Sequence, residues 1–256
     1  MEIRRPRALI RGALAAAAVF AGAGCARQET NVEAGNRAQI LHLGNSAEPA
    51  TLDPQTIQTN ADFNLIMALG EGLVAHDPHD LHPVPGVAER WETSPDGLVW
   101  TFHLRANARW SDGDPVTARD FLFSYQRILS PALGAQYNYM FFAVRGARAF
   151  NAGALSDFSA TGFSAPDDHT LVIALEHPVP YLAQLAAHWS WYPVHPATIL
   201  KFGRSDERDT AWTRPGNHVG NGPFTLAQIA RRSSASESAR RRRASFSGGR
   251  VTLQPK

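Results

Sequence analysis

Between residues 39 and 228, short strand-like segments alternate with short amphipathic helical segments. This alternation limits the possible folds more than any other feature of the chain. Residues 98–104 follow the turn Ser94-Pro95-Asp96-Gly97 and are rich in the β-branched and aromatic residues that sheets favour. Residues 60–73 carry apolar side chains at helical spacing, with Asn60 or Asp62 as possible N-caps and glycines at the end. The order lacks the regular strand–helix–strand alternation of a doubly wound sheet, so the pattern predicts an α/β lobe with a mixed sheet and helices.

The segment 110–121 predicts a turn followed by a helix. Asp112-Gly113 favours a tight turn, and Pro115 restricts the chain after it. Thr117, with Asp120 three residues on, can satisfy the free amides that open a helix. A helix is therefore expected from this point to just before Pro131.

The N-terminus has the three parts of an export signal. Four arginines precede an apolar run over residues 13–23, which ends in Gly22-Ala23-Gly24-Cys25. The run is too short to cross a bilayer as a helix. Small residues directly before Cys25 resemble the lipobox of bacterial lipoproteins, so we expect a signal peptide over residues 1–25 and lipidation of Cys25. Gly22 stands where Leu is usual in that motif, and an ordinary secretory cleavage with an incidental cysteine is the alternative.

Charge is divided unevenly along the chain. Residues 1–24 carry a net charge of +3 and residues 229–256 one of +7, which leaves −8 for the residues between them. The pI of about 8.9 therefore describes the two ends, and the acidic body gives no support for nucleic-acid binding. Arg240 to Arg243 would bind polyanions without sequence preference. The single cysteine excludes a disulfide framework and a zinc site of the paired-cysteine type.

The motifs of the body resemble, in order, those of a known family. They are Leu52-Asp53-Pro54, Glu71-Gly72-Leu73, residues 85–91, residues 100–105, residues 110–121, Asp168-His169-Thr170-Leu171 and Asn221-Gly222-Pro223-Phe224. Over about residues 40–228 the chain resembles the extracytoplasmic solute-binding proteins of oligopeptide and dipeptide ABC importers, the peptide and nickel binding family. The resemblance implies a periplasmic-binding-protein type II-like N-terminal lobe over residues 39–228. It also implies an oligopeptide ligand, ABC permease subunits as partners, no cofactor and a location in the periplasm or at the cell surface.

The resemblance also indicates where a ligand would lie. Gln58, Thr59 and Asn60 match the place where the first lobe offers backbone and side-chain groups to the peptide. Tyr137 matches the place where an aromatic ring leans over it. The alternative for these four residues is a solvated loop and a packed tyrosine.

Both ends of the body have a different composition. Residues 26–38 are polar and are expected to form a flexible tether. The family pattern stops near Gln228, and residues 229–256 are rich in Arg and Ser, which predicts a disordered tail. We expect the second lobe to be missing, with a frameshift or premature stop as the hypothesis. The alternative function is a stand-alone interaction or scaffolding lobe on the cell surface.

Other chemistry is weakly supported. His76, His79 and His82 recur every third position, but Pro78 and Pro83 forbid a regular helix that would bring the imidazoles together, so no metal site is expected. No nucleophile elbow, phosphate-binding glycine loop or His-Glu-x-x-His pair is present, and no enzyme is expected. Asp167-Asp168-His169 is better explained as a turn before a strand than as an acid–base pair. Trp189 and Trp191 are expected in the core or at a lobe interface.

Overall fold

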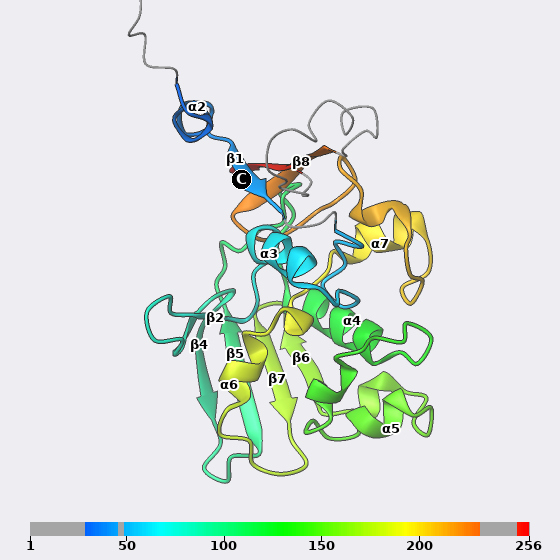
Figure 1. Ribbon diagram of the computed structural model, residues 1–256. Coiled ribbons are helices and arrows are strands. Elements are labelled where there is room, and N and C mark those ends of the chain that lie inside the picture. The colour runs from blue at the N-terminus through cyan, green and yellow to red at the C-terminus, as the bar shows by residue number, and fades with distance from the viewer. Residues whose placement is uncertain (1–28, 46–48, 231–249, 256) are drawn as a thin grey trace, which may run out of the picture. The chain divides into compact units, whose positions relative to one another are not determined.

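The computed structural model describes residues 29–45, 49–230 and 250–255 (Figure 1). The chain divides into two compact units, residues 1–38 and residues 39–256. In the first unit, helix α2 (Asn31–Ala38) begins with a reciprocal pair of capping bonds. Thr30 Oγ1 accepts from the Glu33 amide at 3.2 Å, and Glu33 Oε2 accepts from the Thr30 amide at 2.9 Å. The expected flexible tether is therefore helical over residues 31–38, because Thr30-x-x-Glu33 is a helix-start signal within a polar segment.

The described strands of the second unit form three antiparallel sheets. The largest has the order β4 (Ala88–Thr93), β5 (Val99–Leu104), β7 (Thr170–Ala174) and β6 (Phe163–Asp167). A second sheet has the order β1 (Leu41–Gly44), β9 (Arg250–Pro255) and β8 (Phe224–Ala230), and β2 (Val74–His76) pairs with β3 (Pro83–Pro85). The expected α/β fold is confirmed, but every strand pair among the described residues is antiparallel, so the expected mixed sheet was wrong in this detail.

Short helices connect and cover these sheets. The α-helices are α3 (Asn60–Leu69), α4 (Ala118–Leu129), α5 (Ala147–Asn151), α6 (Leu182–Ala186) and α7 (Pro196–Phe202). The 3₁₀ helices are η1 (Asn138–Phe141), η2 (Phe158–Ala160), η3 (Trp189–Trp191) and η4 (Ala211–Thr213). The expected helix over residues 60–73 ends at Leu69, where Gly70, one of the glycines expected to end it, adopts an extended backbone and caps it. Its N-cap is Thr59 and neither Asn60 nor Asp62. Among the described residues, no helix is both long and apolar enough to cross a membrane.

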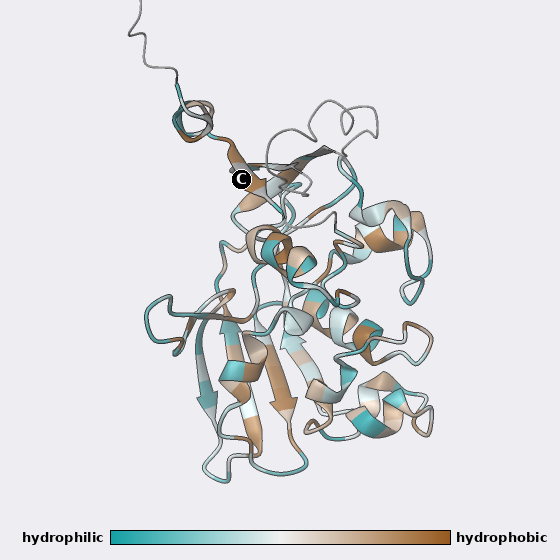
Figure 2. Cartoon of the chain, viewed as in Figure 1, coloured by the Kyte–Doolittle hydropathy of each residue, from teal (hydrophilic) through white to brown (hydrophobic). Residues whose placement is uncertain are grey.

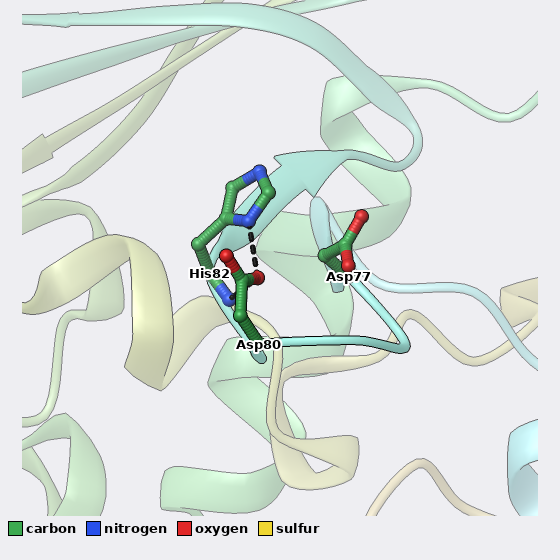
Figure 3. A group of neighbouring side chains, drawn as sticks. All are labelled: Asp77, Asp80 and His82. Carbon is green, nitrogen blue, oxygen red and sulfur yellow. Dashed lines mark hydrogen bonds and ion pairs between the residues drawn. The ribbon is translucent and has the colours of Figure 1, made fainter.

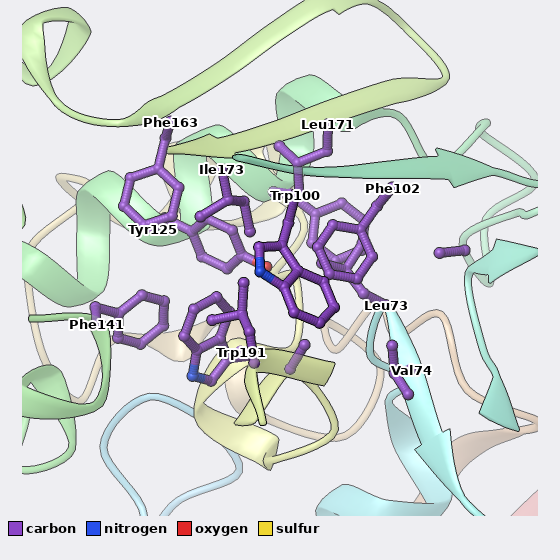
Figure 4. Packing of buried hydrophobic residues seen from close by; sticks show 14 of the residues in the cluster. Leu73, Val74, Trp100, Phe102, Tyr125, Phe141, Phe163, Leu171, Ile173 and Trp191 are labelled. Atoms are coloured by element: carbon purple, nitrogen blue, oxygen red, sulfur yellow. The ribbon is translucent and has the colours of Figure 1, made fainter. Parts of the chain in front are cut away.

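The main core lies between the four-stranded sheet and helix α4, which packs against β6 and β7. Alternate residues of β5 and β7 are buried, as the period of two requires. Figure 4 shows Trp100, Phe102, Leu171 and Ile173 in one cluster with Tyr125 of α4. Hydrophobic residues are concentrated along β7, whereas the edge strand β4 is largely hydrophilic (Figure 2). The predicted capping box of α4 is present, with Thr117 and Asp120 bonded reciprocally.

The C-terminal segment differs from the expected disordered tail at both of its ends. Strand β8 continues to Ala230, and residues 250–255 form β9 in the centre of the three-stranded sheet. Leu253 lies opposite Leu41 of β1 and Leu226 of β8, and its side chain is fully buried. The composition of residues 229–256 hid this strand because its partners come from elsewhere in the chain. Residues 231–249 lie outside the described part.

Candidate functional site

The loop that precedes α3 is held by a buried ion pair. Asp53 accepts hydrogen bonds from Arg127 at 3.1 Å and 2.6 Å, and both side chains are almost completely buried. Gln55 accepts from Arg127 at 2.6 Å and donates to the Ser124 carbonyl at 2.7 Å. The Leu52-Asp53-Pro54 motif therefore attaches the loop to α4, and it fixes the position of the residues that follow.

Gln58, Thr59 and Asn60 are exposed at the N-terminal end of α3. Thr59 Oγ1 donates to Asp62 Oδ2 at 2.8 Å and accepts from the Asp62 amide at 3.2 Å. The Thr59 hydroxyl is thus engaged in capping the helix. Gln58 and Asn60 present their side chains at the surface beside it.

Tyr137 belongs to a row of rings that reaches α3. Its ring centroid lies 5.4 Å from that of Trp189 and 6.3 Å from that of Tyr139. Trp189 in turn lies 4.7 Å from Phe63 of α3 and 3.6 Å from His188. We call Phe63, Trp189, His188, Tyr137 and Tyr139 the aromatic row. Phe63 is one helical turn after Asn60, so the row connects the residues that the sequence predicted as ligand contacts.

The aromatic row is partly exposed and carries little charge. Tyr139 is 55% exposed, and the other four rings are half-buried. Burial, followed by the nearby charge of His76, lowers the pKa of His188 to about 4. His188 is therefore neutral near pH 7, and its Nδ1 accepts from the Ser190 amide at 3.2 Å. The Trp189 indole Nε1–H is buried and has no hydrogen-bond partner among the described residues.

The exposed face of α3 leads from the aromatic row to an open depression of about 470 Å³. Met67, one turn beyond Phe63, lines it together with Glu71, Arg105, Tyr192 and Asn221. Glu71 accepts from Arg105 through both oxygens, at 3.0 Å and 2.5 Å, and this bond raises the pKa of Arg105. The depression therefore has an apolar side and a polar side.

Two motifs of the sequence shape this depression. Tyr192 packs so closely against Gly70 and Gly72 that a Cβ on either would lie 2.9 Å or less from its ring. Asn221 accepts from the Glu71 amide at 3.0 Å and donates to the Glu71 carbonyl at 2.7 Å. The Glu71-Gly72-Leu73 and Asn221-Gly222-Pro223-Phe224 motifs thus hold each other in place.

His76, the last residue of β2, and His82, just before β3, have different partners. His76 Nδ1 lies 3.2 Å from the Leu81 carbonyl, whereas His82 Nδ1 lies 2.5 Å from Asp80 Oδ1. The bond to Asp80 raises the pKa of His82 and lowers that of Asp80. Figure 3 shows Asp77 on the same turn, and the donor atoms of Asp77, Asp80 and His82 lie within 4.8 Å of one another. Since His82 and Asp80 already pair at an exposed turn, the geometry is that of a surface ion pair.

The other features predicted from the sequence have structural roles or lie outside the residues that the structure describes. Asp167 accepts from the His169 amide at 2.8 Å, and the Asp168 carbonyl accepts from the Ala118 amide at 2.8 Å, so this turn supports β7 and the start of α4. Trp191 is fully buried and stacks on Phe141 at 4.1 Å. Cys25 lies outside the described residues.

The sequence did not single out Phe63 or His188 as part of this surface. Phe63 carries the helical spacing of a core residue, and His188 belongs to no recognisable motif. Trp189 was expected in the core or at an interface, and in the structure it is half-buried in the aromatic row. The signal that could have identified these residues is a half-buried ring next to a predicted ligand contact. This signal is visible only in the folded chain, where the two residues are adjacent.

Comparison with known proteins identifies the family. Residues 82–241 match the family described as "Bacterial extracellular solute-binding proteins, family 5 Middle". The periplasmic oligopeptide-binding protein OppA of Escherichia coli is 43% identical over 190 residues, which are 73% of this chain and 33% of that protein. The dipeptide-binding protein DppE of Bacillus subtilis is 33% identical over 193 residues, 74% of this chain and 34% of that protein.

Solved structures give the same result. OppA of Haemophilus influenzae in complex with the peptide RPPGFSPFR matches with a TM-score of 0.65 and 38% identity, over 72% of this chain and 34% of that one. The chain spans about a third of the length of the curated relatives it matches. The family match covers more than half of the chain, and the order of its motifs agrees with it. The chain therefore belongs to the bacterial extracellular solute-binding proteins of family 5.

Proposed function

We propose that this chain supplies one face of an oligopeptide-binding site, as part of the solute-binding component of an ABC importer in the periplasm. The aromatic row beside the exposed Gln58 and Asn60 is the observation that carries the proposal. Several of its relatives are named as peptide-binding proteins, and one was solved with a bound peptide. The family is one of solute-binding proteins and not of enzymes.

The chemistry of the surface suits a ligand whose sequence varies. Half-buried rings offer contact area with little loss of conformational entropy. The amides of Gln58 and Asn60 can donate to and accept from peptide groups, which all peptides share. Because the aromatic row carries little charge at neutral pH, it does not select a charged side chain.

The partners follow from this assignment. We propose that the whole protein presents its peptide to ABC permease subunits, and that lipidation of Cys25 attaches it to the membrane. No cofactor and no specific nucleic acid are part of this proposal. A scaffolding lobe without a peptide ligand is the alternative that the following experiment distinguishes.

The experiment uses the tryptophans as paired probes. The indole Nε1–H groups of Trp189 and Trp191 are both buried and have no partner within the described ranges, but only Trp189 belongs to the aromatic row. The purified chain, labelled with ¹⁵N-tryptophan, is titrated with a mixture of short peptides while its indole resonances are recorded. We expect the Trp189 resonance to shift and the Trp191 resonance to stay, with weak affinity because one face buries only part of a ligand.

A matched pair of tyrosine variants tests the location. Tyr139 is 55% exposed within the aromatic row, and Tyr181 is 56% exposed and makes no ring contact with it. We expect Tyr139→Ala to weaken peptide binding about two- to tenfold, since an aromatic contact contributes ~0.5–1.5 kcal/mol. Tyr181→Ala should leave the affinity unchanged. Equal shifts of both indoles, or no response to any peptide, would contradict the proposal and favour the scaffolding alternative.

A further inference from the structure

Three possible metal ligands outside the aromatic row meet at one point. They are Asp112, Asp114 and His195, whose donor atoms all lie within 4.8 Å of one another. The two aspartates belong to the turn before α4, and His195 immediately precedes α7, so segments about 80 residues apart in sequence are brought together. We propose that these residues bind a divalent transition-metal ion of the Zn²⁺ class.

The turn places both carboxylates on a constrained backbone. The Trp110 amide donates to the Asp114 carbonyl at 2.8 Å, and the Gly113 amide donates to the Trp110 carbonyl at 3.1 Å. Gly113 has φ +101°, a conformation that L side chains rarely adopt. The Asp114 amide donates to Asp112 Oδ1 at 3.2 Å. Asp112 is 38% exposed, so water can complete the coordination of an ion there.

His195 is buried, with Nδ1 hydrogen-bonded and Nε2 facing Asp112. Its side chain is only 7% exposed, and its ring packs 5.0 Å from that of Trp110. Nδ1 lies 2.7 Å from Thr198 Oγ1. Among the described residues Nε2 makes no hydrogen bond, and Asp112 Oδ2 lies 3.7 Å from it, beyond hydrogen-bonding distance. A separation of 3.7 Å is too long for a hydrogen bond, but a metal ion at ~2.0–2.2 Å from each atom can span it, and this spacing within the cluster is the observation that points to a ligand.

The types of donor select the class of ion. One imidazole nitrogen and two carboxylate oxygens suit Zn²⁺ and its neighbours, whereas Ca²⁺ and Mg²⁺ prefer oxygen ligands alone. Metal-bound histidines usually donate their second nitrogen to an oxygen, and Thr198 Oγ1 occupies that position for Nδ1.

The ordinary alternative is an ion pair between a protonated His195 and Asp112. The two explanations predict different responses to metal, because an ion pair gives no saturable Zn²⁺ binding at this place. The full chain is therefore titrated with ZnCl₂ by calorimetry in a non-chelating buffer at pH 7.5. We expect one equivalent to bind more tightly than any other, and the midpoint of thermal unfolding to rise when Zn²⁺ is present.

Isosteric variants assign the ligands. Asp112→Asn and Asp114→Asn keep the size of exposed side chains and should leave the fold unchanged, while each weakens the tight equivalent at least tenfold. His195→Gln should abolish it. Thr198→Val, which removes only the oxygen behind Nδ1, should weaken it about tenfold.

The control is the second group of potential ligands, on the turn between β2 and β3. Asp80→Asn/His82→Gln removes two of its three donors and should leave the tight equivalent in place. The proposal is overturned if tight binding survives in Asp112→Asn and His195→Gln, if it disappears in the Asp80/His82 variant, or if the wild-type chain shows no Zn²⁺ binding.

Discussion

The side chain of Arg127, in helix α4, connects three separate segments of this lobe. Its side chain is fully buried, and it donates to Asp53, Gln55 and the Ser205 carbonyl. A buried charge is tolerated only when its partners replace water. These bonds hold together the loop before α3, helix α4 and the segment after α7.

We expect Arg127→Met to lower the free energy of unfolding by about 3–5 kcal/mol, because it leaves the Asp53 carboxylate buried without its partner. Urea unfolding monitored by circular dichroism measures this. The matched control is Arg119→Met, which removes an exposed ion pair with Asp168 whose side chains are 73% and 58% exposed. Its loss should cost about 0–1 kcal/mol. Similar losses in the two variants would show that the Asp53 pair is not the main anchor.

Individual residues were predictable to the extent that their role is local. The capping box of Thr117 and Asp120 was expected and is present, because it involves residues three apart. Thr59 was expected as a ligand contact, and the structure uses its hydroxyl as the cap of α3. A Thr that can serve either purpose cannot be assigned from its neighbours alone.

Among the strands, β9 gives the C-terminal segment a structural role. It pairs with β1 on one side and with β8 on the other, so it completes a sheet that would otherwise lack its central strand. Its residue Leu253 packs in a cluster with Leu52, Ile57 and Leu65. β9 has only six residues, and its pairing partners lie far away in the sequence. Its own residues therefore give little indication that it is a strand.

We expect Leu253→Ala to lower the free energy of unfolding by about 2–5 kcal/mol, as for other buried leucines. Gln254→Ala, at the next and exposed position, should change it by less than ~0.5 kcal/mol. Chemical unfolding of both variants provides the comparison. If the two behave alike, residues 250–255 do not contribute a packed strand.

The short helix η3 should make stability depend on pH through His188. The pKa of His188 is about 4 in the folded chain, against an ordinary value of 6.5. Between these values the unfolded chain binds the proton and the folded chain does not, so stability falls as the pH drops from about 6.5 to about 4. His188→Asn keeps a side chain able to cap η3 but removes the titration.

The measurement is the difference in unfolding free energy between pH 7 and pH 4.5, taken for both proteins. We expect a smaller difference in His188→Asn than in the wild-type chain. His218, whose pKa is also lowered to about 4, titrates in both proteins and therefore cancels in this comparison. An identical pH dependence would show that His188 does not contribute to it.

The N-terminal signal predicts where the whole protein is located. We expect the chain expressed in a bacterium to incorporate labelled palmitate and to sediment with membranes, because Cys25 follows a short apolar run and small residues. Cys25→Ala should abolish the label and release the protein into the soluble periplasmic fraction. Membrane association without label, or label retained in Cys25→Ala, would exclude lipidation at this residue.

The family, the α/β class and the positions of several elements, among them α3, α4 and β5, could be predicted from the sequence. Turns, caps and alternating apolar residues act over a few positions, so their physics can be read along the chain. Two of the motifs each have one direct partner, since Asp53 pairs with Arg127 and Asn221 bonds to the backbone of Glu71.

Which distant residues share a surface could not be predicted from the sequence and became evident in the folded chain. The aromatic row joins α3, η1 and η3, and the proposed metal ligands join the turn at Asp112 to the start of α7. The same holds for the antiparallel sheets and the central place of β9. Such contacts arise when the packing of a common core brings together segments from distant parts of the chain, and no local property of either segment encodes the distance between them.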